Sequence, residues 1–181
     1  MVSKINIVLA SENHLNSIDK MYKDCIKYLN EKKLFQWDDT YPNREFFIKS
    51  IKNKDLYILM IEKKIIGAVA LNEEQAPEWK TVKWKNKEGK FLVIHALAIH
   101  PDYQNNGYGK ILYNFCENFA ITNKYDGIRL DAFSENKNAL EFYKRKGFKK
   151  MGDAYFAFKP KNHQCYFCYE KILDFESLES K

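Results

Sequence analysis

The chain has 181 residues, of which 45% are hydrophobic and 15% aromatic, and its formal net charge at pH 7 is +6. These values fit a globular protein with one packed core and exclude a disordered chain. No apolar run approaches the roughly 18 residues that span a membrane, and the first residues lack a signal-peptide pattern. Together with four scattered cysteines, these features predict a cytoplasmic protein without membrane contact.

The N-terminal third predicts one strand followed by two helices. Residues Lys4–Ala10 are apolar enough for a strand, and Ser11 has the side chain of a helix N-cap. A helix follows, in which apolar residues recur on one face as far as Leu29. Pro42 and Asn43 then open a second helix that ends near Asn53.

The middle of the chain predicts three strands. Two apolar runs, Leu56–Glu62 and Ile65–Leu71, are separated by two lysines and predict a hairpin. Residues 72–90 are charged and predict a loop or ragged strand ends. The segment Phe91–Ile99 is apolar enough for a central, buried strand.

The remaining segments complete the predicted order. They are a strand at Gly127–Ala132, a helix from Asn136, and two strands at Met151–Phe158 and Gln164–Leu173. We assign residues 1–174 to one domain and expect residues 175–181 to fray. The order β-α-α-β-β-β-α-β-α-β-β predicts a mixed α/β fold with helices on both faces of one sheet.

A glycine loop between the central strand and the next helix carries the clearest functional signal. Apolar residues recur with helical period from Tyr108 to Phe119. The first amides of a helix have no intrahelical acceptor, and the helix dipole makes this end positive. Gly107 and Gly109 let a ligand approach the backbone, and Lys110 adds a charge. We interpret the stretch as a pyrophosphate cradle; a helix start with tight-turn glycines and no ligand is the alternative.

Two common phosphate-binding motifs do not fit this loop. A P-loop would place Ser or Thr after Lys110, where this chain has Ile111, and the dinucleotide fingerprint needs a third glycine. The stretch resembles instead the acyl-CoA-binding motif of the GNAT superfamily, the acetyl-CoA-dependent N-acetyltransferases. The motif Gln/Arg-x-x-Gly-x-Gly/Ala is matched by Gln104, Gly107 and Gly109.

A second motif supports the same resemblance. In the family, a strand is followed by Asn-x-x-Ala, an aromatic-Tyr pair and Gly-Phe, which are matched by Asn136, Ala139, Phe142-Tyr143 and Gly147-Phe148. The resemblance covers roughly residues 3 to 173. It implies the GNAT fold, in which a mostly antiparallel sheet of six to seven strands splays between its fourth and fifth strands. These strands correspond to Phe91–Ile99 and Gly127–Ala132.

The resemblance implies acetyl-CoA as the acyl donor and no metal. In the family, the strand before the glycine loop contacts pantetheine and the acetyl carbonyl through its backbone, and the loop amides bind the pyrophosphate. A later asparagine and tyrosine reach the pantetheine arm and the sulfur; for the asparagine, helix capping alone is the alternative. The matching residues are Leu97, Ala98, Ile99, Gln104, Asn105, Asn106, Gly107, Tyr108, Gly109, Lys110, Asn136 and Tyr143.

Tyr143 matches the family tyrosine whose hydroxyl faces the CoA sulfur, so the resemblance makes it the general acid that protonates the leaving thiolate. A half-buried helix tyrosine that only packs beside Phe142 and Leu140 is the alternative. His95 precedes Leu97 by two residues on the same predicted face, and it is the candidate general base because an unperturbed histidine titrates near ~6.5. A histidine that only packs in the core or lines the cleft is the alternative, and Glu73 and Glu74 are alternative bases. No cysteine occupies a matched position, so direct attack in a ternary complex is expected.

The expected acceptor is a primary amine on a small molecule or a protein. The linker between the first two helices and the strands near it should line its pocket, which makes Gln36, Trp37, Tyr41 and Glu73 candidate substrate contacts. Acidic residues in these segments could attract a cationic amine. For Trp37, a core position is the alternative.

Other functions are less well supported. The Cys-x-x-Cys of Cys165 and Cys168 offers too few ligands for zinc, and residues three apart in a strand point to opposite faces. Lysines cluster at 83–90 and 144–150, but no nucleic-acid-binding motif accompanies them. A non-catalytic acyl-CoA sensor and a basic nucleic-acid-binding protein remain the alternative functions. A homodimer is also open, with Tyr166, Phe167 and Tyr169 as the only hint of an interface.

Overall fold

The structure, a computed structural model, describes residues 4–174. Its seven strands form one sheet in the order β1-β2-β3-β4-β5-β7-β6. The pairs β1–β2, β2–β3, β5–β7 and β6–β7 are antiparallel, and β4–β5 is parallel. The strands are β1 Ile5–Leu9, β2 Leu56–Ile61, β3 Lys64–Asn72, β4 Phe91–Ile99, β5 Gly127–Phe133, β6 Lys149–Tyr155 and β7 Cys165–Ile172. The predicted mixed α/β class with a mostly antiparallel sheet is confirmed.

Helices accompany the sheet in the predicted order. They are α1 Leu15–Glu31, α2 Arg44–Lys52, α3 Tyr108–Thr122 and α4 Lys137–Arg145, with the short 3-10 turns η1 Glu12–His14, η2 Pro77–Thr81 and η3 Pro101–Tyr103. Within residues 4–174, no helix combines the length and the apolar character that a membrane crossing requires.

The elements group into two compact units. The first unit contains the chain up to Asn72 together with Ile94–Cys116, and the second contains Glu73–Val93 and the chain from Glu117 onward. Strand β4 and helix α3 therefore each contribute residues to both units.

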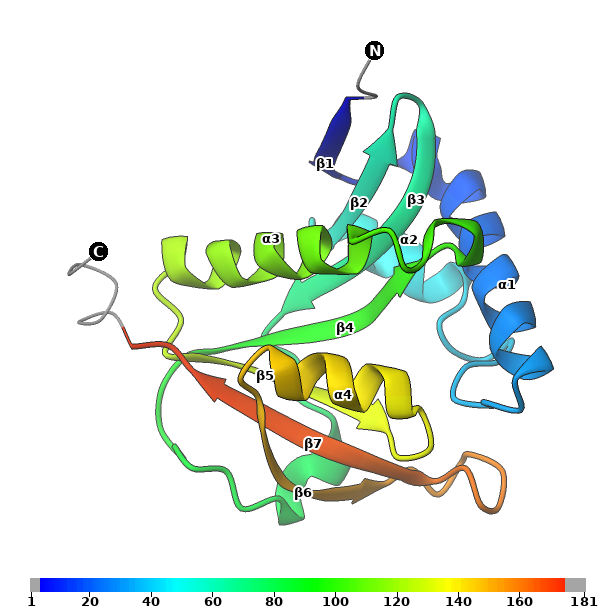
Figure 1. Cartoon of the computed structure of the whole chain (residues 1–181). Coiled ribbons are helices and arrows are strands. Elements are labelled where there is room, and N and C mark those ends of the chain that lie inside the picture. Colours follow the sequence, from blue (N-terminus) through cyan, green and yellow to red (C-terminus); the bar gives the residue numbers. More distant parts are fainter. Residues whose placement is uncertain (1–3, 175–181) are drawn as a thin grey trace. The chain divides into compact units, whose positions relative to one another are not determined.

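In the first unit, α1 and α2 lie behind β2 and β3, and the start of α3 lies in front of them (Figure 1). The apolar face of α1 explains this packing, because Ile18, Tyr22 and Cys25 recur at helical spacing and are nearly inaccessible to solvent. They share a core with Phe47 of α2 and Ile58 of β2.

In the second unit, α4 lies in front of β5 (Figure 1). Pairing of β5 with β7 places Leu130 opposite Tyr169 and Asp131 opposite Cys168. Cys168 packs in a core with Trp79 of η2. Tyr166 and Tyr169, the proposed hint of a dimer interface, are largely buried within the chain at 8% and 7% exposure.

Several local predictions need correction. Ser11 is an N-cap as predicted, but of the short turn η1, and α1 itself begins at Leu15. Strand β6 occupies residues 149–155 rather than the predicted 151–158. The predicted loop at residues 72–90 contains η2, which forms because Trp79 inserts its side chain into the core of the second unit. The predicted frayed segment, residues 175–181, lies outside the described residues.

Candidate functional site

The glycine loop, which joins β4 to α3, and the first turn of α3 together hold most of the predicted cofactor-binding residues. Gln104 donates from Nε2 to the Ile99 carbonyl at 3.0 Å, which ties the loop to the end of the strand. Asn105 and Gly107 adopt positive φ angles of 64° and 81°. A Cβ at Gly107 would meet no atom within 4 Å, so the backbone there faces open space.

Helix α3 begins directly after this glycine. The Ile111 amide donates a hydrogen bond to the Gly107 carbonyl at 3.1 Å, which is the first hydrogen bond of the helix. The amides of Tyr108, Gly109 and Lys110 precede it and belong to the turn where helical amides lack intrahelical acceptors. Since the dipole is positive at this end and the Lys110 side chain is exposed, the local geometry suits phosphate oxygens.

The end of β4 carries the predicted main-chain contacts. Ala98 and Ile99 are 6% and 8% exposed, and Leu97 is half-buried. Between Leu97 and His95, Ala96 has a φ of 50°, in the left-handed region. The prediction that His95 and Leu97 share a face assumed regular alternation, which this residue interrupts.

His95 is half-buried, and its Nε2 lies 2.8 Å from the Asn72 Oδ1 atom. The Asn72 Nδ2 atom donates in turn to Asp55 at 3.3 Å. Because an amide oxygen can only accept, the neutral His95 ring donates from Nε2 and carries its lone pair on Nδ1. The sequence did not identify Asn72 and Asp55 as partners of this histidine.

Helix α4 positions the two predicted pantetheine residues. Asn136 caps the helix by accepting a hydrogen bond from the Ala139 amide at 3.1 Å. Tyr143 is 9% exposed, and its ring centroid lies 5.6 Å from that of Phe148 and 6.4 Å from that of Tyr169. Capping by Asn136 is thus observed, whereas the ligand contacts of both residues stay predictions.

The linker between α1 and α2 contains a short backbone bridge. Asp38 and Tyr41 exchange two backbone hydrogen bonds of 3.1 and 3.2 Å. Trp37 packs against the core of the first unit, with its ring 5.8 Å from that of Tyr22. Gln36 and Tyr41 are half-buried.

A surface pocket of about 400 Å³ opens beside this linker. Its lining combines acidic and basic side chains: Asp19, Lys23, Ile26, Asp38, Asp39, Pro42, Asn43, Arg44 and Glu45. The predicted substrate contacts of the linker, Gln36, Trp37 and Tyr41, are outside that lining. The acidic residues expected to attract a cationic amine, Asp38 and Asp39, are part of it.

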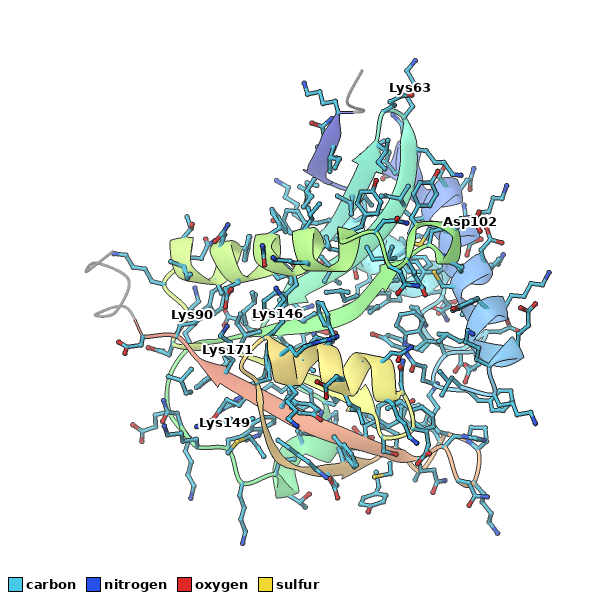
Figure 2. All side chains as sticks on the ribbon, viewed as in Figure 1. Lys63, Lys90, Asp102, Lys146, Lys149 and Lys171 are labelled. Carbon is cyan, nitrogen blue, oxygen red and sulfur yellow. The ribbon has the colours of Figure 1, made fainter. Side chains whose placement is uncertain are left out.

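Glu73, the other predicted substrate contact, lies in the second unit. Its Oε1 accepts a hydrogen bond from the Tyr125 hydroxyl at 3.0 Å and lies 3.7 Å from the Lys90 ammonium group. Lys90, labelled in Figure 2, also lies 4.2 Å from the centroid of the Tyr125 ring. Glu73 therefore has protein partners, and its predicted role toward an acceptor stays a prediction.

Asp131 is a titratable residue that the sequence analysis did not identify. It is half-buried on β5, and the Trp79 indole donates to its Oδ2 at 3.0 Å. Burial raises the pKa of Asp131 to about 6; the Trp79 hydrogen bond lowers it, and Glu78 raises it further. A single acidic residue in the otherwise apolar end of the strand, Leu130–Phe133, was the available signal.

A buried ion pair was likewise not predicted from the sequence. Arg129 and Glu170 are 4% and 3% exposed, and Arg129 Nη2 lies 2.8 Å from Glu170 Oε2. The guanidinium group also donates to the Asn86 carbonyl at 2.5 Å and lies 3.7 Å from the Phe91 ring centroid. These contacts anchor the 72–90 segment to β5.

The C-terminal lysine cluster surrounds an apolar surface. A pocket of about 560 Å³ has Leu140, Phe148 and Tyr169 among its lining residues, together with Lys137, Glu141, Lys144, Lys149 and Lys150. The nearby Lys171 donates to the Lys146 carbonyl at 2.8 Å and forms an ion pair with Glu117 (Figure 2).

Two further groups bear on the predictions. Within the described part of the chain, no group of three or more His, Cys, Asp or Glu side chains could hold a metal ion.

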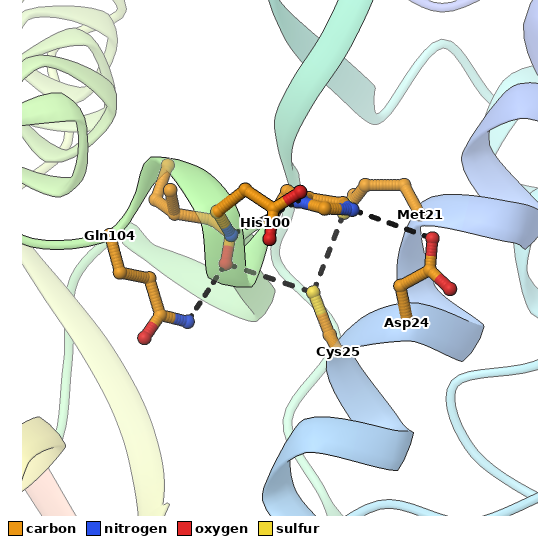
Figure 3. Close-up of polar contacts among 7 residues, drawn as sticks. Met21, Asp24, Cys25, His100 and Gln104 are labelled. Atoms are coloured by element: carbon orange, nitrogen blue, oxygen red, sulfur yellow. Dashed lines mark hydrogen bonds and ion pairs between the residues drawn. The ribbon is translucent and has the colours of Figure 1, made fainter.

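His100, which the sequence did not favour for chemistry, lies at the start of the glycine loop. Its Nε2 is 3.4 Å from Asp24 (Figure 3), and its Nδ1 is 3.8 Å from Asp102.

The predicted residues therefore fall into two local groups. His95, the end of β4 and the glycine loop belong to the first unit, as does the linker with Gln36 and Trp37. Glu73 and the two α4 residues, Asn136 and Tyr143, belong to the second.

Comparison with known proteins identifies related sequences and folds. The sequence profile described as the Acetyltransferase (GNAT) family matches residues 19–148. An uncharacterised N-acetyltransferase of Methanocaldococcus jannaschii is 27% identical over 136 residues, which are 72% of this chain. The chain spans about half, 53%, of that relative's length.

Solved structures share the fold. A GNAT-family acetyltransferase of Streptococcus agalactiae has a TM-score of 0.77 and 19% identity, and the match covers 94% of this chain and 96% of that one. A structure of the NatC complex bound to Gag peptide and CoA has a TM-score of 0.69 and 19% identity, over 94% of this chain and 99% of the matched chain.

Proposed function

Because the chain belongs to the acetyltransferase (GNAT) family, we propose that it transfers an acetyl group from acetyl-CoA to a primary amine. The observation that carries this proposal is the glycine loop. Gly107 has a φ of 81° and open space beside it, directly before the first turn of α3. Such a backbone can receive the pyrophosphate of CoA on helix amides, with Lys110 adding charge.

The proposed reaction is a direct attack in a ternary complex. The neutral amine attacks the thioester carbonyl, the C–S bond breaks, and CoA leaves as a thiolate. Tyr143 protonates that thiolate, and His95 takes the proton that the amine loses. The backbone of Leu97, Ala98 and Ile99 binds pantetheine and the acetyl carbonyl, and Asn136 binds the pantetheine arm. The loop residues Gln104 to Lys110 bind the pyrophosphate.

For His95, the proposal gains support from the contact with Asn72. That contact holds the ring in one orientation, and a neutral imidazole can accept a proton directly or through water. Glu73 and Glu74 stay the alternative bases. The exposed Glu73 already accepts a hydrogen bond from Tyr125.

The proposed acceptor class is an amine on a small molecule or a peptide. The NatC complex was solved with a peptide and CoA, which supports a peptide amine as one of the first acceptors to test. We propose Gln36, Trp37, Tyr41 and Glu73 as acceptor contacts. The free thiols of all four cysteines support a reducing, cytoplasmic location.

The experiment that tests this function is calorimetric titration with acetyl-CoA, with CoA and ATP as comparators. We expect saturable acetyl-CoA binding that Gly107→Ala weakens by about 10-fold or more, since its Cβ would occupy the space of the phosphate. Gly147→Ala is the matched control. Gly147 has a similar φ of 85°, but its added Cβ would only make an ordinary contact of 3.7 Å with Lys171.

The outcomes separate the alternatives. An enzyme also releases CoA thiol when an amine is added, whereas a sensor binds acetyl-CoA without amine-dependent thiol release. Folded protein that fails to bind acetyl-CoA contradicts the transferase. Equal losses of acetyl-CoA affinity in Gly107→Ala and Gly147→Ala would show that the effect comes from backbone strain.

A further inference from the structure

The end of β4 contains a backbone conformation that needs external support. Ala96, in the second half of the strand, has a φ of 50°. An L-residue with a side chain is disfavoured in this left-handed region and keeps such a conformation only where neighbouring groups hold it. The residues His95 to Leu97 are half-buried, whereas Phe91–Ile94 and Ala98–Ile99 are buried.

Helix α1 supplies the support through two side chains one turn apart. The Tyr22 hydroxyl donates to the Ala96 carbonyl at 2.5 Å. The Cys25 sulfur lies 3.7 Å from the Ile99 carbonyl oxygen and 3.6 Å from the Met21 sulfur, and its single proton can be donated to either of them (Figure 3). The Ile99 carbonyl also accepts from Gln104. The two carbonyls lie on either side of Leu97 and Ala98, so α1 contacts this short segment at both ends, and the Tyr22 hydroxyl makes the hydrogen bond beside Ala96.

Tyr22 is well suited to hold the Ala96 carbonyl in one place. It is 1% exposed, and its ring stacks on Phe47 at 4.7 Å and lies 5.8 Å from Trp37. Burial raises the pKa of Tyr22 well above its usual value and raises the pKa of Cys25 to about 12. Both groups therefore stay protonated and can donate across the physiological pH range.

A fixed carbonyl also fixes the amide on the other side of the same peptide bond. The peptide group is planar and trans, so its C=O and N–H point in opposite directions. Because the Ala96 carbonyl points to Tyr22, the Leu97 amide points away from α1. A hydrogen-bond donor held in one direction can stabilise charge on a reacting carbonyl at no further reorganisation cost.

We propose that Tyr22 is a positioning residue, whose hydroxyl holds the Ala96–Leu97 peptide so that the Leu97 amide is presented to the thioester carbonyl of acetyl-CoA. This inference rests on the proposed function. It extends the functional residues to α1, where the sequence showed only a core tyrosine.

The test is Tyr22→Phe, which keeps the stacked ring and removes only the hydroxyl. Carbonyl-labelled acetyl-CoA bound to the protein without an amine is examined by isotope-edited infrared spectroscopy. In the unmodified protein, we expect the thioester carbonyl stretch to lie below that of free acetyl-CoA. In Tyr22→Phe, it should shift back toward the free value, while the calorimetric affinity for CoA, which lacks the acetyl group, stays within about 2-fold.

Turnover provides the second readout. With a peptide amine that the unmodified protein acetylates, kcat should fall by about 10-fold in Tyr22→Phe with little change in the KM for acetyl-CoA. This loss is smaller than the 10²–10³-fold loss on deleting a direct donor, because the amide remains but is less well oriented. Tyr113→Phe is the control, since Tyr113 is also fully buried in the first unit.

The results distinguish this inference from the proposed function. If the unmodified protein binds and uses acetyl-CoA but Tyr22→Phe has the same carbonyl frequency and kcat, the positioning role is wrong and the function stands. A similar change in carbonyl frequency and kcat in Tyr113→Phe would also overturn the positioning role, since the loss of any buried hydroxyl would then produce the effect. If the unmodified protein does not bind acetyl-CoA, the proposed function is wrong and this inference falls with it.

Discussion

Asp131 is a residue whose chemistry depends on its surroundings. Burial raises its pKa to about 6, compared with about 3.9 for an exposed aspartate. Between these values, the folded state binds more protons than the unfolded state. Its favourable contribution to stability is therefore fully present below about pH 4 and is lost as the pH rises through about 6.

Replacing Asp131 with Asn should therefore stabilise the protein at pH 7.5. The amide oxygen can still accept the Trp79 hydrogen bond of 3.0 Å, but no charge has to be buried. We expect the free energy of unfolding to rise by on the order of 1–2 kcal/mol, a figure reduced for solvent screening because Asp131 is only half-buried. Urea unfolding at pH 4, 5, 6 and 7.5 measures this difference, which should disappear by pH 4.

Asp102→Asn is the control for this prediction, because the Asp102 side chain is 75% exposed. It should leave the stability at pH 7.5 nearly unchanged. A loss of stability in Asp131→Asn that is the same at every pH would show that the side chain acts through its shape and hydrogen bond rather than through its titration.

Among the elements, β4 combines a packed interior with the proposed contacts to acetyl-CoA. Its close approach to β3 requires a glycine, because a Cβ on Gly67 would lie 2.7 Å from Ile99 Cδ1 and 2.9 Å from the Ala98 carbonyl oxygen. Ala98 and Ile99 are among the residues proposed to bind pantetheine. Packing against β3 and the proposed binding function therefore involve the same few residues.

Gly67→Ala should destabilise the protein by about 1–3 kcal/mol, because a methyl group must be forced into a filled space beside a backbone oxygen. Denaturant unfolding measures the loss. Gly152→Ala on β6 is the matched control, since its Cβ would approach no atom closer than 3.4 Å. Equal effects of the two substitutions would contradict the packing explanation.

At the scale of the whole molecule, the two compact units share elements. The chain passes from one unit to the other within β4 and within α3. Complete unfolding of either unit would therefore break a strand and a helix of the other. This sharing supports the proposal that residues 1–174 act as one N-acetyltransferase domain.

Differential scanning calorimetry should accordingly give one unfolding transition, with equal calorimetric and van't Hoff enthalpies. Acetyl-CoA in excess should raise its midpoint without splitting it, because a ligand that binds only the folded state stabilises by mass action. Two separate transitions, or a shift of only part of the heat signal, would show that the units unfold independently.

Local patterns in the sequence determined the order of helices and strands, the glycine loop and the asparagine-tyrosine motif of α4. They could do so because helical period, strand length and motif spacing involve residues close together in the chain. The same patterns placed Tyr22 and Cys25 on the buried face of α1. They also led to the family, through Gln104, Gly107, Asn136 and Tyr143.

Only the tertiary structure decided what these residues contact. Tyr22 bonds a carbonyl 74 residues away, Arg129 pairs with a carboxylate 41 residues away, and His95 contacts an amide 23 residues away. The left-handed Ala96 and the raised pKa of Asp131 also depend on such distant neighbours. The apolar pattern of a strand does not identify these partners, because hydrogen bonding and burial depend on separate segments meeting in the folded chain.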